Sequence, residues 1–197
     1  MMSPPGLVCI WAARLGSFLV ERVMKVGKDV RFDKVKHDPA KFFVYWSVQG
    51  LWVFVTLLPT LALHSSTLNP AFGMRDLLGF GIWGLGFALE VIADKQKSDF
   101  KADPANEGKF IKEGLWGISR HPNYLGEITL WTGLYLSCSS TLTGAQHLVV
   151  LSPVFVALLI TKYVVSIFSY SSCPKIDKLT TQIFPGSLEF LFWKHLA

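Results

Sequence analysis

Residues 44–63 read VYWSVQGLWVFVTLLPTLAL, a run that contains no charged side chain. A helix needs about 20 apolar residues to cross a hydrocarbon core about 30 Å thick. The run therefore predicts a transmembrane helix that ends near His64. A chain that contains such a helix is expected to be an integral membrane protein.

The composition of the whole chain favours the same class of protein. Of the 197 residues, 51% are hydrophobic and 17% are charged, and the mean hydropathy is +0.39. Soluble domains carry more charge than this. The polar connectors are too short to bury a core of their own. We therefore predict a single membrane domain over residues 1–197.

A second span is predicted after Arg75 and Asp76, where residues 77–93 read LLGFGIWGLGFALEVIA. Small residues allow membrane helices to approach each other closely. The glycines that could serve this purpose are Gly79, Gly81, Gly84 and Gly86. Two more apolar stretches, residues 124–142 and 147–168, have a short connector and are expected to form a helical hairpin.

The first apolar stretch is less clear, because residues 6–23 contain Arg14 in the middle. It can be a buried helix or a helix in the membrane interface, and its depth stays open. Together the stretches predict an all-α integral membrane protein, a bundle of about four to five transmembrane helices.

The positive charges of the connectors indicate how the helices are oriented. Most of them precede the first clear span, lie between the second and third spans, or follow the fourth. The connectors between the first and second spans and between the third and fourth hold only Arg75. Basic connectors stay on the cytoplasmic side. The expected location is therefore a multi-pass protein of the endoplasmic reticulum if the source is eukaryotic, or of the inner membrane if it is bacterial.

Other classes of site are not favoured. The cysteines Cys9, Cys138 and Cys173 have neither the pairing nor the spacing of a disulfide framework or a zinc site. The formal net charge is +5, but the basic residues border apolar segments, where they set topology and contact anionic lipid. We therefore expect membrane lipid as a partner, no nucleic acid and no metal.

The stretch that indicates chemistry is residues 90–131, because ionisable residues crowd the cytoplasmic ends of two spans. If the second helix continues beyond the membrane, spacings of three and four residues give its polar side chains one common face. They are Glu90, Asp94, Lys97 and Lys101. Such a face can bind a hydrophilic ligand, or it can be a solvated helix end with intrahelical ion pairs.

Residues 120–127 read RHPNYLGE and add a second polar group. Pro122 suits the first turn of a helix, so the third span is predicted to start there. Asn123 and Glu127 would then share a face. A carboxylate one turn inside a span indicates either a functional group or an ion pair, here with Arg14 or Arg120. Arg120 and His121 at a helix N-terminus would form a phosphate site.

The segments GLWGISRHPNYLGE (114–127), ADKQKSDFK (93–101) and ARLGSFLVERVMKVGKDVRFD (13–33) resemble the steroid 5-alpha reductase-like membrane reductases. The likeness is closest to poorly characterised members with the steroid reductase C-terminal domain. Sterol C14 reductases share a similar RHPNYLG signature. The resemblance covers residues 11–131.

This resemblance implies an NADPH site near the cytoplasmic face. Asp94 and Lys101 would approach the cofactor from the second helix, and Asn123 and Glu127 would bind its nicotinamide and ribose portion. Arg120, His121 and Tyr124 would contact its phosphates and sugars. The catalytic acid cannot be identified from the sequence.

The resemblance further implies an NADPH-dependent oxidoreductase of lipid metabolism that acts on CH–CH groups. It would reduce a carbon–carbon double bond in a lipophilic enone or steroid-like small molecule. Members commonly have further helices before the region around residue 13, and residues 169–197 diverge from the family's tail. The chain is therefore expected to be shortened at its N-terminus and divergent at its C-terminus.

Two alternatives remain open. Isoprenylcysteine carboxyl methyltransferases use a similar RHPxYxG turn with S-adenosylmethionine, although their later paired glutamates are absent here. A non-catalytic membrane scaffold is the other alternative.

The charge pattern makes a prediction about sidedness. Cysteines introduced at Ser98 and Thr143 should react with an impermeant thiol reagent from opposite faces of the membrane, because one span separates them. Labelling of intact and permeabilised vesicles measures this, and reaction of both from the same face would refute the topology.

Overall fold

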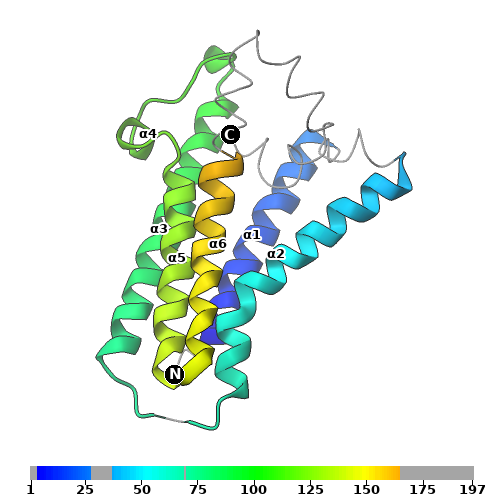
Figure 1. Cartoon of the computed structure of the whole chain (residues 1–197). Coiled ribbons are helices and arrows are strands. Elements are labelled where there is room, and N and C mark those ends of the chain that lie inside the picture. The colour runs from blue at the N-terminus through cyan, green and yellow to red at the C-terminus, as the bar shows by residue number, and fades with distance from the viewer. Residues whose placement is uncertain (1–3, 28–36, 69, 165–197) are drawn as a thin grey trace. The chain divides into compact units, whose positions relative to one another are not determined.

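A computed structural model describes residues 4–27, 37–68 and 70–164 of the chain (Figure 1). Every regular element within these residues is helical. The α-helices are α1 (Pro4–Val26), α2 (Pro39–Ser65), α3 (Met74–Ala102), α4 (Leu115–Ile118), α5 (Pro122–Cys138) and α6 (Leu151–Leu158). Short 3-10 helices are η2 (Pro104–Asn106), η3 (Ser139–Thr141) and η4 (Gly144–Val150), and the π-helical η5 (Leu159–Val164) follows α6.

Three helical stretches of the described chain are long and apolar enough to cross a membrane: Pro39–Ser65, Met74–Ala102 and Gly144–Thr161. The prediction of an all-α membrane protein is confirmed. Helix α5 has 17 residues, which at a rise of about 1.5 Å per residue is about 25 Å and shorter than a hydrocarbon core. The number of four to five spans therefore stays a prediction.

The chain divides into two compact units, Met1–Leu57 with Ala157–Ala197 and Leu58–Val156. The division falls inside α2, next to Pro59. A proline within a helix removes one backbone hydrogen bond and clashes with the preceding turn. Continuity of α2 is therefore weakest where one unit ends and the other begins.

In the first unit, α1 and the first part of α2 share an aromatic contact. The rings of Trp11 and Trp52 are 6.2 Å apart at their centroids, and both side chains are buried. Arg14 lies 5.4 Å from the Phe18 ring centroid. Helix α1 is not among the three stretches of the described chain that are long and apolar enough to cross a membrane.

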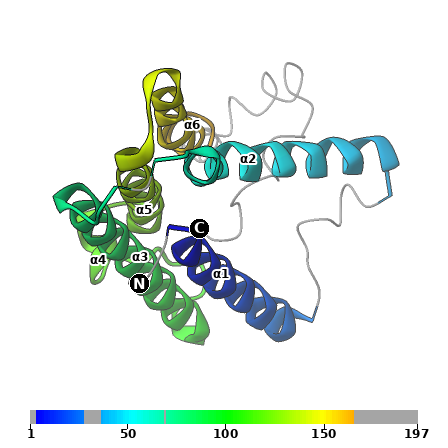
Figure 2. The ribbon, with the colours of Figure 1, turned by 90° about the horizontal axis from the view of Figure 1, so that it is seen from below.

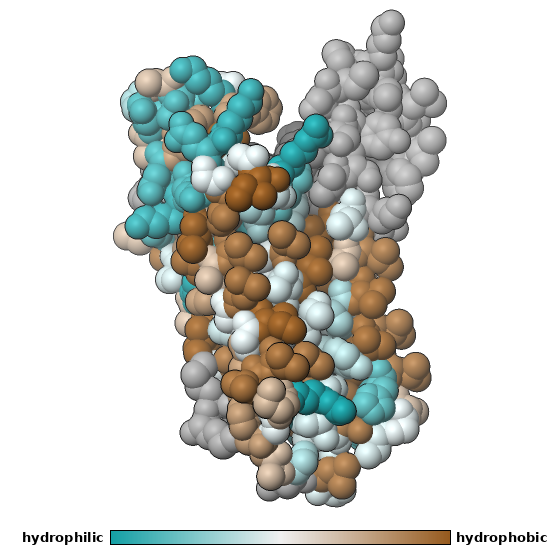
Figure 3. All heavy atoms as spheres, turned by 90° about the vertical axis from the view of Figure 1, so that its left-hand side faces the viewer, coloured by the Kyte–Doolittle hydropathy of each residue, from teal (hydrophilic) through white to brown (hydrophobic). Residues whose placement is uncertain are grey.

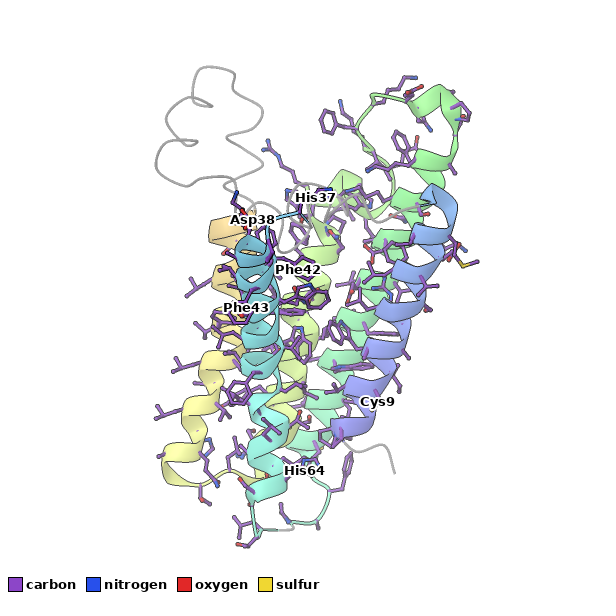
Figure 4. The ribbon with its side chains drawn as sticks, turned by 90° about the vertical axis from the view of Figure 1, so that its right-hand side faces the viewer. Cys9, His37, Asp38, Phe42, Phe43 and His64 are labelled. Atoms are coloured by element: carbon purple, nitrogen blue, oxygen red, sulfur yellow. The ribbon has the colours of Figure 1, made fainter. Side chains whose placement is uncertain are left out.

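The N-terminal end of α2 is capped by Asp38, which Figure 4 labels beside His37. Its Oδ1 accepts a hydrogen bond from the Lys41 backbone N–H at 3.1 Å, and its Oδ2 lies 3.0 Å from Lys41 Nζ. These interactions lower the pKa of the Asp38 carboxyl. An acidic cap suits this position because the first backbone N–H groups of a helix lack intrahelical partners.

The second unit is built on α3 and α5, which run side by side in two perpendicular views (Figures 1 and 2). Glycines let the two backbones touch. A Cβ atom on Gly86 would lie within 3.0 Å of Leu130 and Gly126 backbone atoms, and one on Gly126 would lie 2.7 Å from the Glu90 N. Gly79 and Gly133 make the same kind of contact nearer the other end.

The structure corrects one detail of the expected glycine packing. Gly79 and Gly86 face α5, whereas a Cβ atom added to Gly81 or Gly84 would have nothing within 4 Å. The difference follows from helical periodicity, because residues seven apart share a face and residues two apart do not. Only half of the predicted glycines therefore serve the contact with α5.

The far ends of α3 and α5 are also tied together. Asp76 accepts a hydrogen bond from the Ser140 hydroxyl at 2.9 Å and from the Gly73 backbone N–H at 2.9 Å. Arg75 Nη1 donates to the Ser139 carbonyl at 3.3 Å. The bonds to Ser139 and Ser140 join the N-terminal end of α3 to η3, which directly follows α5.

The side of the molecule that Figure 3 shows is mainly apolar over its middle and polar at the end that holds the C-terminal part of α3. The exposed large apolar side chains of α3 are Met74, Leu77, Leu78, Leu85 and Ile92. Exposed leucines of this kind suit the acyl chains of a bilayer. The polar residues of α3 follow this apolar stretch.

The glycine contact predicts an asymmetric mutational response. Gly86→Ala and Gly126→Ala should lower the thermal midpoint in detergent, since forced overpacking costs about 1–3 kcal/mol. Gly81→Ala and Gly84→Ala are matched controls with open space at Cβ, and they should leave the midpoint unchanged or raise it. Equal shifts in both pairs, measured by thermal unfolding, would contradict the packing.

Candidate functional site

The C-terminal half of α3 buries three ionisable side chains on one face. The exposed fractions are 0% for Glu90, 3% for Asp94 and 9% for Lys97. Helix α3 runs to Ala102 and so includes all four residues of the predicted polar face. Lys101, one turn after Lys97, is exposed. The polar face therefore passes from buried to solvent-accessible along the helix.

Helix α5 contributes its own buried polar residues from its first two turns. Pro122 occupies the first turn as predicted, and the exposed fractions are 2% for Asn123, 4% for Tyr124 and 1% for Glu127. The first helical hydrogen bond is donated by Leu125 N–H to the His121 carbonyl at 3.2 Å. The amides before Leu125 are therefore placed where helices commonly bind anions.

The two groups form one cluster, because the glycine contact brings these helix ends together. Gly126 faces the Glu90 backbone, and the Tyr124 hydroxyl interacts electrostatically with both Glu127 and Asp94. The cluster thus joins carboxylates from α3 to an amide, a phenol and a carboxylate from α5. It lies wholly within the second unit.

Glu127 has a defined partner within α5. Trp131, one turn later and 2% exposed, donates its Nε1–H to Glu127 Oε1 at 3.1 Å. The sequence suggested a salt bridge to Arg14 or Arg120 as an alternative to a functional role. The indole contact orients the carboxylate, since an indole N–H is a donor only, and the salt bridge stays a prediction.

Asn123 presents an unusual polar atom. Its Oδ1 is buried and has no hydrogen-bond partner among the residues the structure describes. Leaving such an acceptor unsatisfied costs about 1–3 kcal/mol. An amide oxygen in this situation can accept a hydrogen bond from a bound ligand.

The connection between α3 and α5 folds back onto α3 through α4. Trp116 donates its Nε1–H to the Ala93 carbonyl at 3.0 Å, and Gln96 Oε1 accepts from the Leu115 N–H at 3.0 Å. Lys97 Nζ lies 4.5 Å from the Trp116 ring centroid, within the range of a cation–π contact. Gly114 permits this turn because its φ is +58°.

His121 lies next to the cluster, directly before the first residue of α5. Its ring stacks on Tyr124 with 4.8 Å between centroids. Burial lowers the pKa of His121, and the charges of Lys97 and Arg120 lower it further. The imidazole is therefore neutral at pH 7, beside two cations. Arg120 itself is exposed.

The predicted site residues thus separate into two groups. Asp94, Asn123, Tyr124, Glu127 and His121 gather around the joined helix ends. Lys101 and Arg120 are exposed beside them. Whether any of these residues binds a cofactor stays a prediction.

The sequence placed Glu90 and Lys97 on the polar face of the second helix but did not assign them to the cofactor site, and it did not single out Trp116 or Trp131. In the structure Glu90, Lys97 and Trp131 are buried and Trp116 bonds to Ala93. The tryptophans gave no signal, because their roles depend on contacts with Ala93 and Glu127. Among the described residues, no group of three or more His, Cys, Asp or Glu could hold a metal ion.

Comparison with known sequences gives a family match. Residues 5–177 match the family described as a protein of unknown function, DUF1295. An uncharacterised protein of Schizosaccharomyces pombe is 27% identical over 157 residues, which is 66% of this chain and 46% of that protein. No solved structure matches the chain.

Two enzymes with named activities match shorter regions. A delta(14)-sterol reductase of Gibberella zeae is 33% identical over 113 residues, 49% of this chain and 22% of the enzyme. A probable O-methyltransferase of Ustilaginoidea virens is 36% identical over 67 residues, 34% of this chain and 23% of the enzyme. The chain thus spans less than half the length of these relatives.

The electrostatics of His121 yield a prediction. Lys97→Gln and Arg120→Gln should each raise the pKa of His121, because each removes a positive charge that disfavours the imidazolium. Lys112→Gln is the control. Titration of the His121 ring signal by NMR, assigned with His121→Gln, measures the change, and an unaltered pKa in both variants would exclude the electrostatic contact.

The lowered pKa of His121 also predicts how the stability of the folded chain changes with pH. The folded chain binds this proton more weakly than the unfolded chain, whose histidine pKa is about 6.5. The contribution of His121 to the free energy of unfolding therefore falls as the pH is lowered through about 6.5 and below. This contribution is constant at higher pH.

Proposed function

The chain belongs to the DUF1295 family of proteins of unknown function, and we propose that it is an NADPH-dependent membrane reductase. Its substrate would be a carbon–carbon double bond in a lipophilic enone or steroid-like compound. The observation that carries this proposal is the burial of Glu90, Asp94, Lys97, Asn123 and Glu127 between two helices of a membrane protein.

The energetic cost of this cluster supports a functional role. Taking one charged group out of water costs several kcal/mol even after relaxation. Ionisable residues within membrane helices therefore usually mark ligand or proton sites. The distant similarity to delta(14)-sterol reductases favours a reductase among the activities such a cluster could serve.

The residues present fit a dinucleotide. Asn123 Oδ1, a buried acceptor without a partner among the described residues, would accept from the nicotinamide carboxamide or a ribose hydroxyl. Asp94 and Glu127 would accept from further hydroxyls, and Tyr124 would flank the same portion. Lys101, Arg120 and His121 lie toward the exposed end, where side chains with N–H donors can meet the phosphates.

When bound, NADPH would supply the hydride for the double bond. The chain's own residues would orient the cofactor, hold the substrate carbon near it and exclude water. The adjacent carbon would receive a proton from a protein group or water, and no described residue is assigned to that step. The lipophilic substrate would reach the cluster from the surrounding membrane lipid.

A methyltransferase is the second candidate, favoured by the match to the probable O-methyltransferase. In that case the same acidic and amide side chains would bind the ribose and amino acid portions of S-adenosylmethionine. A membrane scaffold without either cofactor is the third. The location would be the endoplasmic reticulum membrane in a eukaryote or the inner membrane in a bacterium.

Cofactor binding separates these candidates without knowledge of the substrate. NADPH should raise the thermal midpoint of detergent-purified protein, because a ligand at 100 times its dissociation constant stabilises the folded state by about 2.7 kcal/mol. S-adenosylmethionine should not. Asn123→Ala and Glu127→Gln should remove most of the NADPH shift, and Arg120→Gln should weaken NADPH through lost phosphate contacts.

Glu107→Gln is the matched control, since this carboxylate is exposed on the connection after α3, and its shift should equal that of the wild type. A folded wild-type protein without an NADPH shift would reject the cofactor assignment. A shift with S-adenosylmethionine instead would transfer the assignment to the methyltransferases. NADPH oxidation measured with a panel of enones tests turnover.

A further inference from the structure

The connection between α3 and α5 carries two exposed apolar side chains, Phe110 and Ile118, which are 87% and 86% exposed. Ile118 ends α4. Burying an isoleucine fully is worth about 1.5–3 kcal/mol, so leaving it in water forgoes that contribution. An isoleucine at this exposure either contacts an apolar environment outside the chain or contributes nothing to stability.

The level of Ile118 along α3 is fixed by two hydrogen bonds. Leu115 N–H donates to Gln96 Oε1 at 3.0 Å, and Trp116 Nε1–H donates to the Ala93 carbonyl at 3.0 Å. Helix α4 therefore lies beside residues 93–96, directly after Ile92, the last exposed apolar residue of the α3 surface. Ile118 thus adjoins the edge of the band that faces lipid.

Helix α5 continues the same band. Leu125, in its first turns, is 52% exposed and follows Ile118 by seven residues. Between Gly108 and His121 the charged residues are Lys109, Lys112, Glu113 and Arg120, three cations and one carboxylate, a net charge of +2. All four are exposed. Apolar side chains flanked by cations are typical of segments that lie in the interface of an anionic leaflet.

We propose that α4 is an interfacial membrane anchor. Ile118 inserts among the acyl chains at the edge of the leaflet where α3 and α5 meet the cytoplasm, and the exposed Lys109 and Lys112 contact lipid phosphates. Because Trp116 of the same turn is bonded to Ala93, the lipid surface also holds the connection against the buried cluster. The occupant of this surface is the bilayer itself.

Site-directed spin labelling in nanodiscs that hold one protein copy tests the anchor. The lipid is phosphatidylcholine with phosphatidylserine, and the background is Cys9→Ser and Cys173→Ser with the buried Cys138 retained. A label on Ile118→Cys should be more accessible to dissolved oxygen than to a water-soluble nickel complex. Leu85→Cys on the lipid face is the positive control, and Glu107→Cys on the same connection should give the opposite order.

A label at position 118 that behaves like the one at 107 would overturn the proposal. Low accessibility to both reagents would mean that protein covers Ile118, which also overturns it. If removal of residues 165–197 then opened the position, the cover would be this chain's own C-terminal segment. The test needs no cofactor, so its failure is independent of the NADPH assignment.

Discussion

The backbone contact between α3 and α5 is the constraint on which the rest of the second unit depends. Gly79 and Gly86 lie seven residues apart on one helix, and Gly126 and Gly133 lie seven apart on the other. Each pair faces backbone atoms of its partner. Within a bilayer no hydrophobic effect drives helices together, so close van der Waals contact of this kind supplies much of the attraction. A side chain at any of these positions would separate the helices.

This contact also fixes the register that assembles the polar cluster. Gly126 meets the Glu90 backbone, so the buried face that continues to Asp94 lies opposite Asn123 and Glu127. A slip by one helical turn, about 5.4 Å, would move α3 carboxylates against apolar residues of α5. The packing of α3 on α5 and the assembly of the polar cluster are thus coupled. The glycines that permit close contact of the two helices alternate along them with the polar residues that this contact brings together.

The position of the cluster at the end of the apolar band suits a protein that joins a water-soluble cofactor to a membrane-borne molecule. The polar residues of the cluster are buried from water, whereas the exposed Lys101 and Arg120 can attract an anion from solution. The same geometry would serve a reductase or a methyltransferase, since both position a polar cofactor beside an apolar substrate. The chain is similar over short regions to a delta(14)-sterol reductase and to a probable O-methyltransferase.

The sequence by itself determined the helical membrane class, the start of α5 at Pro122 and the polar face of α3, because these follow from hydrophobic length, proline geometry and helical spacing. Tertiary structure alone decided which glycines touch a neighbour, that Trp131 orients Glu127 and that Trp116 bonds to Ala93. It also decided that Lys97 is buried while Lys101 is exposed. The physical reason is that spacing defines a face of a helix, but only packing against another element determines what that face meets.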